Sequence, residues 1–300
     1  MKLLFFDDFK LGALKGDQVD DIPRVGPHDV INGLIERWGD YKAKLEAAVA
    51  AGAGVPVSSV KIRPPLPRPV NFDCMAVNYM EDGWRKEPAP INAFHKSASA
   101  IIGDGDTMVL PDVAATIFEG EAEVGIVIGK AASHVSAANA KDYIFGYVNF
   151  IDGSARGIPP AANSFYQVKS RDGFAPIGPY LVTADEIPDP QHIQVKLWNN
   201  GVLMQDFNTN DMANNLGRCV EFISSIHALH PGDIIASGTN HRGLNPFMDG
   251  DKIEMETEHL GRLTIHVKDE LKRTWDRKRR ADLPGFPDEI APQLTGKYAK

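Results

Sequence analysis

Two glutamates and one aspartate have a spacing that could build a metal site. Glu121 and Glu123 open an apolar run, and the alternation of side chains along a strand places both on one face. Asp152 follows a second apolar run, Tyr143–Ile151. Adjacent carboxylates at the ends of apolar strands are costly unless a cation lies between them, and such an all-oxygen set suits Mg²⁺, Mn²⁺ or Ca²⁺. On spacing alone, a solvated strand edge is the commoner explanation.

The elements that must position these carboxylates are mostly strands. From Phe72 onward, short apolar runs are separated by turn residues, and Asn200-Gly201 is typical of a two-residue hairpin. This pattern favours an α+β, mostly β fold with a barrel or rolled sheet. Few helices are expected there: Met80–Lys86, Ala137–Asp142 and Leu216–Leu229. The predicted strands are Phe72–Val77, Thr107–Leu110, Glu121–Ile128, Tyr143–Ile151, Tyr180–Val182, Ile193–Asn199, Val202–Gln205, Asp233–Ala236, Lys252–Glu256 and Leu263–Val267.

Residues 1–69 are expected to form a small N-terminal β/α domain and a linker, and residues 70–300 the main domain. The N-terminal part combines strand-like runs with a helix expected at Val30–Ala51, whose apolar residues recur on one face. Residues 63–69 are rich in proline, which excludes helix and is typical of a stiff linker. Residues 270–300 are a charged tail, which we expect to wrap a neighbouring subunit or to stay loose.

Composition excludes several classes of protein. The chain has 32 Lys and Arg against 40 Asp and Glu, and a net charge of −8 disfavours binding to nucleic acid or to an anionic membrane. Its apolar runs are far shorter than the ~20 residues of a membrane span, and no signal peptide is evident at the start, so a cytoplasmic protein is expected. The basic cluster Arg277–Arg280 is interpreted as a solvated face or subunit contact. Cys74 and Cys219 are predicted to be reduced and buried.

Residues 70–268 resemble the fumarylacetoacetate hydrolase family. The likeness is carried by Phe94-His95-Lys96-Ser97, by Glu121-Ala122-Glu123, and by Asp152-Gly153-Ser154-Ala155-Arg156. The resemblance implies a mixed β-roll core with a small N-terminal domain, usually in a homodimer or higher homo-oligomer. It also implies that Glu121, Glu123 and Asp152 bind Mg²⁺ or Mn²⁺, with Ca²⁺ possible. Acylpyruvase-like and 2-hydroxyhepta-2,4-diene-1,7-dioate isomerase-like members are the implied relatives, acting in catabolism of aromatic compounds or sugar acids.

The same resemblance implies roles for residues around the metal. Lys169 matches the family's lysine, and its ammonium would stabilise negative charge on an enolate; its alternative is a plain surface lysine. Gly238 and Thr239 match a loop that holds substrate, or are simply a tight turn. Arg156 either orients Asp152 or binds a substrate carboxylate. Tyr79 is a further candidate for substrate binding, because it lies in the segment that matches the family's lid.

The segment Asn78–Arg85 departs from the family pattern. Hydrolytic members carry Asn-Tyr-x-x-His followed by Glu, which together activate water. Here Asp82 stands at the position of the histidine, and Arg85 at that of the glutamate. The base is therefore expected to be Asp82 or Glu81, or a histidine from another direction, His241 or His95.

Three functional hypotheses remain open from the sequence. The first is hydrolysis of a C–C bond in an acylpyruvate or another 1,3-dicarbonyl acid, with a metal-stabilised enolate as leaving group. The second is non-hydrolytic chemistry on a 2-oxo acid (tautomerisation or isomerisation, decarboxylation or dehydration), which a metal and a lysine suffice to support. The third is a binding or scaffold protein with an inactive site, which the costly charge cluster argues against. In the first two cases the partner is a small oxo-acid, with neither nucleic acid nor membrane involved.

Overall fold

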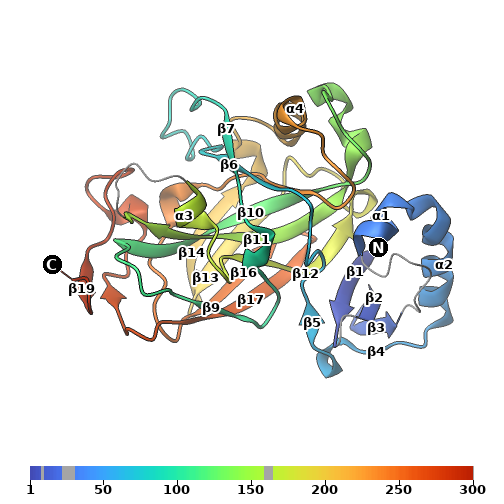
Figure 1. Cartoon of the computed structure of the whole chain (residues 1–300), viewed down its shortest axis with the longest axis horizontal. Helices are drawn as coiled ribbons and strands as arrows, with labels where there is room; N and C mark the ends of the chain where they lie inside the picture. The colour runs from blue at the N-terminus through green and yellow to red at the C-terminus, as the bar shows by residue number, and fades with distance from the viewer. Residues whose placement is uncertain (8–9, 22–30, 159–164, 300) are drawn as a thin grey trace.

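The structure is a computed structural model that describes residues 1–7, 10–21, 31–158 and 165–299 (Figure 1). Its largest sheet has twelve strands, in the order β4-β3-β2-β1-β12-β11-β10-β15-β6-β7, with β5 paired to β1 and β8 to β12. Its members are β1 Lys2–Phe6, β2 Lys10–Lys15, β3 Gln18–Asp21, β4 Val55–Pro56, β5 Ile62–Arg63, β6 Phe72–Ala76, β7 Asn92–His95, β8 Ile101–Ile102, β10 Ile117–Ile128, β11 Ile144–Arg156, β12 Ala175–Thr183 and β15 Ile234–Ala236.

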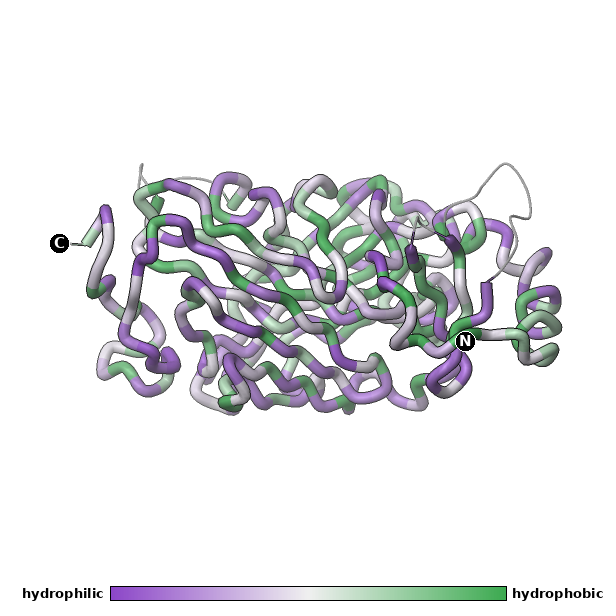
Figure 2. Tube along the Cα trace, turned by 90° about the horizontal axis from the view of Figure 1, so that it is seen from below, coloured by the Kyte–Doolittle hydropathy of each residue, from purple (hydrophilic) through white to green (hydrophobic). Residues whose placement is uncertain are grey.

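A second sheet of five strands packs against the first and has the order β14-β13-β16-β17-β9. Its members are β9 Thr107–Val109, β13 Gln194–Asn199, β14 Val202–Asn208, β16 Lys252–Thr257 and β17 Gly261–Lys268. Buried and outward residues alternate along β16 and β17, and hydrophobic and hydrophilic segments alternate along the chain in Figure 2. The hairpin between β13 and β14 turns at Asn200 and Gly201, whose φ angles of 52° and 79° suit the predicted two-residue turn. The mostly β prediction is confirmed.

The strand β10 separates two hydrophobic cores. Ala122, Val124 and Ile126 belong to a core shared with the five-stranded sheet, whereas Val127 belongs to a core shared with the N-terminal strands and helices. All twelve residues of β10 are buried. The predicted division of β10 into two faces therefore holds, but neither face reaches solvent.

The N-terminal segment joins the main sheet instead of forming a separate one. Strand β1 pairs with β12, so β1–β4 extend the edge of the large sheet (Figure 1). The proline-rich stretch is also packed, because Pro64, Pro65 and Leu66 are buried. The predicted boundary near residue 70 remains a prediction.

Two helix predictions were wrong in part or in full. The helix expected at Val30–Ala51 is two helices, α1 Ile31–Glu36 and α2 Trp38–Ala51, and Val30 lies outside the described residues. No helix forms at Met80–Lys86, because Glu81, Asp82 and Gly83 have φ angles of 57°, 53° and 76°. Positive φ is incompatible with a right-handed helix, so this segment is a turn.

The other helices lie close to their predicted positions. A 3₁₀ helix occupies Ala137–Tyr143, and α4 spans Leu216–Ile226, three residues shorter at its end than predicted. The short helix α3, Phe165–Lys169, was not predicted. Among the residues that the structure describes, no helix combines the length and apolar character needed to cross a bilayer.

The C-terminal tail packs on its own chain, so the prediction that it stays loose was wrong, whereas contact with a neighbouring subunit remains a prediction. Strands β18 Thr274–Trp275 and β19 Gln293–Thr295 pair with each other, and the Trp275 side chain is buried against Phe118 of β10. The basic cluster is likewise no uniform solvated face, since Arg280 is buried and Arg277 binds Asp251. Both cysteines are free and buried, as predicted.

Candidate metal centre and catalytic cavity

The three predicted metal ligands meet because β10 and β11 pair antiparallel along their whole length. Glu121 lies directly opposite Asp152, and Glu123 lies two residues further along the same face of β10. One carboxylate oxygen from each residue lies within 4.8 Å of the others, and all three side chains are buried. Asp152 is inside β11, not at a strand end as predicted, because β11 continues to Arg156. The carboxylates thus form a set held rigidly by cross-strand pairing.

Two buried lysines lie against this set. Lys169 Nζ, at the end of α3, lies 2.6 Å from Asp152 Oδ2 and 2.9 Å from Glu121 Oε2. Lys96 Nζ lies 2.6 Å from Asp152 Oδ1 and also donates to the Lys169 carbonyl. The alternative reading of Lys169 as a surface lysine is wrong, since its side chain is only 3% exposed. Sequence analysis gave Lys96 no role, although it lies in the motif that carries the resemblance.

Arg156 lies between two glutamates of β10. Its guanidinium donates to Glu119 and to Glu121. Glu119 also accepts from Arg280 of the C-terminal tail, at 3.0 Å from Nε and 2.6 Å from Nη2. Arg156 therefore orients Glu121 and Glu119, not Asp152, and Glu119 and Arg280 are site-supporting residues that sequence analysis missed.

Glu123 is the carboxylate that lacks a cation. It makes no ion pair within the described part of the chain, and its Oε2 accepts a hydrogen bond of 2.7 Å from the Gly238 N–H. Burial, followed by the neighbouring charges of Asp152 and Glu121, raises the pKa of Glu123 well above its usual value. A divalent cation bound by these three carboxylates would supply the missing charge, so the donor set fits Mg²⁺ or Mn²⁺.

The charges of Glu121 and Lys169 are set by their mutual contact. Burial alone would raise the pKa of Glu121, but Lys169 and Arg156 outweigh it and hold that pKa well below its usual range. Burial alone would lower the pKa of Lys169, but Asp152 and Glu121 outweigh it and raise that pKa. The pair is therefore an ionised carboxylate and an ammonium, as enolate stabilisation requires.

A histidine and a glutamate form a hydrogen-bonded pair beside the carboxylates. His241 Nδ1 lies 2.6 Å from Glu81 Oε1, and the His241 backbone N–H donates to Glu81 Oε2 at 2.7 Å. Glu81 is buried and lies in a turn where a helix was predicted, and the turn at Glu81–Gly83 directs its side chain inward. His241 begins a short 3₁₀ helix, His241–Gly243.

One cavity is lined by six of the twelve predicted site residues. Its polar wall contains Glu121, Arg156, Lys169, Gly238, Thr239 and His241. Its apolar wall contains Met75, Ala76, Val77, Phe94 and Phe165. Phe94 stacks on Phe165 with ring centroids 4.6 Å apart, which joins β7 to α3 at the rim. A small site with convergent polar groups on an apolar background is typical of an enzyme cavity.

Three candidates lie elsewhere. Tyr79 is fully buried against Phe207, with ring centroids 5.0 Å apart, and does not line the cavity. Asp82 is exposed and lies 3.4 Å from Arg242, so it faces away from the carboxylates. His95 contacts Asp73 on the outer side of β7.

Two residues of the predicted substrate loop are engaged within the protein. The Thr239 hydroxyl donates to the Ala122 carbonyl at 2.7 Å and accepts from Gln205. Gly238 has a φ of 86°, and an added Cβ would lie 2.9 Å from Asn78 Cβ. This loop therefore fixes the position of Glu123 and of β10, and its part in substrate binding remains a prediction.

Three buried carboxylates on one mixed sheet, with Lys169 of α3 against them and Glu121 lining a cavity, define a candidate divalent-metal enzyme. The family model for the fumarylacetoacetate (FAA) hydrolase C-terminal domain matches residues 70–268. The chain therefore belongs to the fumarylacetoacetate hydrolase family, and the resemblance found in the sequence is confirmed.

Relatives in this family differ in their reactions. The maleylpyruvate hydrolase of Aquipseudomonas alcaligenes is 30% identical over 291 residues, which cover 89% of this chain and 99% of that protein. A maleylpyruvate hydrolase from Sphingobium sp. SYK-6, solved with manganese(II) and pyruvate, is 32% identical with a TM-score of 0.80, over 90% of this chain and 99% of that one. A 2-hydroxyhepta-2,4-diene-1,7-dioate isomerase from Mycobacterium marinum is 28% identical with a TM-score of 0.72, again over 90% and 99%.

Proposed function

We propose that this chain hydrolyses a C–C bond in an acylpyruvate or a related 1,3-dicarbonyl acid. The observation that carries the proposal is the Glu81–His241 pair. Hydrolysis requires a base that removes a proton from water, and the positions of the family's histidine and glutamate hold Asp82 and Arg85 here. His241 lines the same cavity as Glu121 and Lys169, so the base is supplied from a different part of the chain.

Glu121, Glu123 and Asp152 would hold the metal. A divalent ion there supplies Lewis-acid polarisation of the substrate's 2-oxo group. The manganese and pyruvate in the Sphingobium relative support this role, because pyruvate is the oxo-acid half of an acylpyruvate. Of the metals expected from the sequence, Mn²⁺ and Mg²⁺ both suit the three oxygens, and Ca²⁺ would need more ligands.

His241 would act as general base through Nε2. Its Nδ1–H donates to Glu81, which leaves Nε2 as the acceptor for a proton from water. The hydroxyl attacks the acyl carbonyl, the bond between the acyl carbon and C3 breaks, and its electron pair passes to the pyruvate enolate. Protonation of C3 then gives pyruvate and a second carboxylic acid. Glu81 stabilises the imidazolium that forms in between.

Lys169 would stabilise the negative charge that develops on the substrate. Its ammonium is buried and already held between Asp152 and Glu121, so it needs no reorganisation during the reaction. Lys96 neutralises the other oxygen of Asp152 and keeps that carboxylate in place. Arg156 positions Glu121 from the opposite side. The machinery is therefore largely preorganised.

Proton NMR of acetylpyruvate in D₂O, with enzyme and either Mg²⁺ or EDTA, tests the proposal directly. Metal-dependent formation of equal amounts of pyruvate and acetate is the expected result. The variant Glu123→Gln, which lacks one ligand oxygen charge, should form neither. Enzyme-dependent deuterium exchange at C3 without pyruvate formation would instead favour the tautomerase alternative. A parallel sample with oxaloacetate tests decarboxylation, which is favoured if the enzyme forms pyruvate from oxaloacetate but not from acetylpyruvate.

A further inference from the structure

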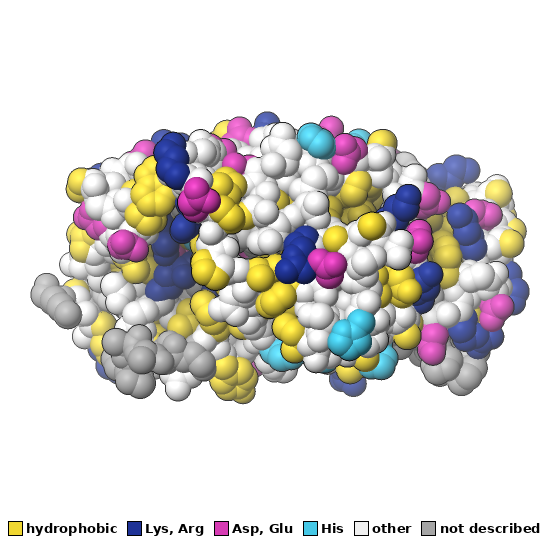
Figure 3. Space-filling model, turned by 90° about the horizontal axis from the view of Figure 1, so that it is seen from above, with side chains coloured by type: hydrophobic (Ala, Val, Ile, Leu, Met, Phe, Trp, Pro, Cys, Tyr) yellow, Lys and Arg dark blue, Asp and Glu magenta, His cyan; other side chains and the backbone are white. Residues whose placement is uncertain are grey.

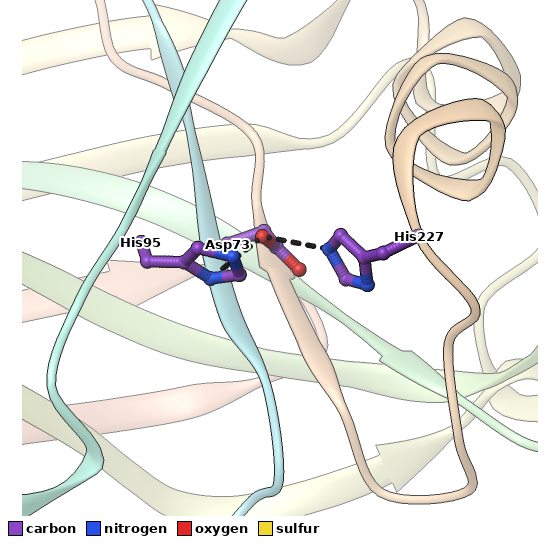
Figure 4. A group of neighbouring side chains, drawn as sticks. All are labelled: Asp73, His95 and His227. Atoms are coloured by element: carbon purple, nitrogen blue, oxygen red, sulfur yellow. Dashed lines mark hydrogen bonds and ion pairs between the residues drawn. The ribbon is translucent and has the colours of Figure 1, made fainter.

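A second cluster of potential metal ligands lies outside the cavity. Asp73, His95 and His227 place one ligand atom each within 4.8 Å of the others (Figure 4). The cluster joins three elements, since Asp73 is on β6, His95 is on β7 and His227 directly follows α4. In Figure 4 the Asp73 carboxylate lies between the two imidazole rings. This cluster contains nitrogen ligands, which the three-carboxylate site lacks.

Backbone pairing holds two of the three residues together. Asp73 and His95 are directly opposite each other in the β6–β7 ladder, so their side chains emerge on the same face. His227 is the first residue after α4, and the C-terminal end of a helix favours positive charge nearby. Strand pairing thus fixes two of the positions, and the end of a helix fixes the third.

The Asp73 carboxylate is incompletely satisfied. Its Oδ1 is 3.1 Å from His95 Nδ1 and 3.2 Å from His227 Nε2, while Oδ2 is buried and has no hydrogen-bond partner among the described residues. The side chain is only 4% exposed. A buried carboxylate oxygen without a partner is costly, so the cluster has an unmet need for a cation or donor.

His227 is oriented as a metal-binding histidine is. Its Nδ1 lies 3.0 Å from the Ala228 carbonyl, which can only accept, so Nδ1 carries a proton and Nε2 is the ring nitrogen that faces Asp73. A metal ion bound between Nε2 and the Asp73 carboxylate would take the place of any proton shared by them and would contact both. The nearby Asp233 is not available, because it accepts hydrogen bonds from Asn71 and the His230 N–H.

We propose that Asp73, His95 and His227 bind one divalent transition-metal ion, with Zn²⁺ as the preferred metal. Ligand atoms around a tetrahedral Zn²⁺ with bonds of ~2.0–2.1 Å lie about 3.3 Å apart, close to the 3.1 Å and 3.2 Å observed here. Imidazole nitrogens suit Zn²⁺, whereas Mg²⁺ prefers the all-oxygen site. The two sites therefore differ in the metal that they select.

The site is accessible from solvent. The His95 side chain is 64% exposed and that of His227 is 27% exposed, so an ion can enter and a water can complete the coordination. Histidine side chains are visible on the face that carries β6, β7 and α4 (Figure 3). A bound ion would tie α4 to the edge strands of the large sheet, on the segment that leads directly to Met75 and Val77 of the cavity wall.

Cobalt(II) titration of the metal-free Glu123→Gln variant tests the proposal. The substitution and an excess of Mg²⁺ both suppress binding of Co²⁺ at the carboxylate site. We expect one Co²⁺ per chain with the intense visible absorption of tetrahedral, nitrogen-containing coordination, displaced by Zn²⁺. Adding His95→Ala should weaken binding by at least about 100-fold, since loss even of an outer-shell partner commonly costs 10–100-fold. His227→Ala should do the same.

His266→Ala is the matched control, because His266 is exposed and lies on β17, outside the cluster. It should keep the affinity of the background variant, and Zn²⁺ should raise its melting temperature but not that of the His95→Ala variant. Circular dichroism verifies that each variant is folded. We expect the His95→Ala variant to fold, because the His95 side chain is exposed. Equal affinities for the His95→Ala and His266→Ala variants, or a spectrum of octahedral oxygen ligands alone, would overturn the proposal.

Discussion

Glu81 accepts two hydrogen bonds from His241, one from the ring and one from the backbone, although the two residues are 160 positions apart. This two-point contact fixes both the ring and the start of the 3₁₀ helix that carries it. The strained turn at Glu81, with a φ of 57°, is what directs its side chain toward His241. The turn therefore serves the orientation of the proposed base.

Removing either member of this pair should slow hydrolysis. We expect His241→Asn and Glu81→Gln to lower kcat by about 10²–10⁴, the usual contribution of a general base. Glu81→Gln cannot accept both hydrogen bonds, so the ring loses its fixed orientation. Steady-state kinetics with acetylpyruvate at saturating metal concentration measures the effect on kcat.

Asp82→Asn is the matched control for this prediction. Asp82 neighbours Glu81 in sequence but is exposed and lies next to Arg242. Its rate should stay within about twofold of wild type, as for most surface substitutions. A large loss in the Asp82 variant together with a normal rate in the Glu81 variant would assign the base to Asp82 instead.

Lys169→Met should separate catalysis from metal binding. The ammonium interacts with Asp152 and Glu121, so its loss leaves the carboxylates more negative and should keep or strengthen their affinity for Mn²⁺. The turnover rate should fall by ~10²–10³, as for loss of one donor to a developing oxyanion. Calorimetric Mn²⁺ titration alongside kinetics distinguishes the two effects, with the exposed Lys130→Met as control.

Glu123→Gln should abolish metal-dependent activity yet stabilise the metal-free protein. The pKa of Glu123 is raised in the fold, so its ionised form is disfavoured, and the cost grows as pH rises through that pKa. Gln removes the charge and keeps an acceptor for the Gly238 N–H. Each kcal/mol of relief should raise Tm by about 2–4 °C.

Thermal unfolding with EDTA from acidic to neutral pH measures this gain. It should be largest at neutral pH and shrink as pH falls, because Glu123 itself becomes protonated there. With Mn²⁺ added, the order should reverse and wild type should be the more stable protein. A variant that is less stable at every pH without metal would contradict the raised pKa.

The sequence predicted what depends on local periodicity and failed where contacts are long-range. Alternation along a strand was enough to place Glu121 and Glu123 on one face, and Asp152 joined them because strand pairing preserves that face. The pairing of Glu81 with His241 has no local signal. The helix predicted at Met80–Lys86 does not form either, because tertiary contacts hold Glu81 and Asp82 at positive φ.

The C-terminal tail shows the same limit. Arg280 occurs within a run of four basic residues, and composition alone predicts solvent exposure for such a run. Only the fold reveals that this side chain binds Glu119, 161 positions earlier, which Arg156 also binds. Its neighbour Arg279 stays at the surface with Asp282.

That contrast gives a stability test within two adjacent residues. Arg280→Met should lower the free energy of unfolding by about 3 kcal/mol, the lower end for breaking a buried ion pair, because Arg156 still faces Glu119. Arg279→Met breaks an exposed pair and should cost about 0–1 kcal/mol. Urea unfolding of metal-free protein measures both losses of stability, and equal losses would show that the tail does not depend on Glu119.

The pKa of Glu119 would rise with burial, but Arg280 and Arg156 hold it below its usual value. A depressed carboxyl pKa contributes stability that is lost as pH falls through it, so the penalty of Arg280→Met should narrow in acid.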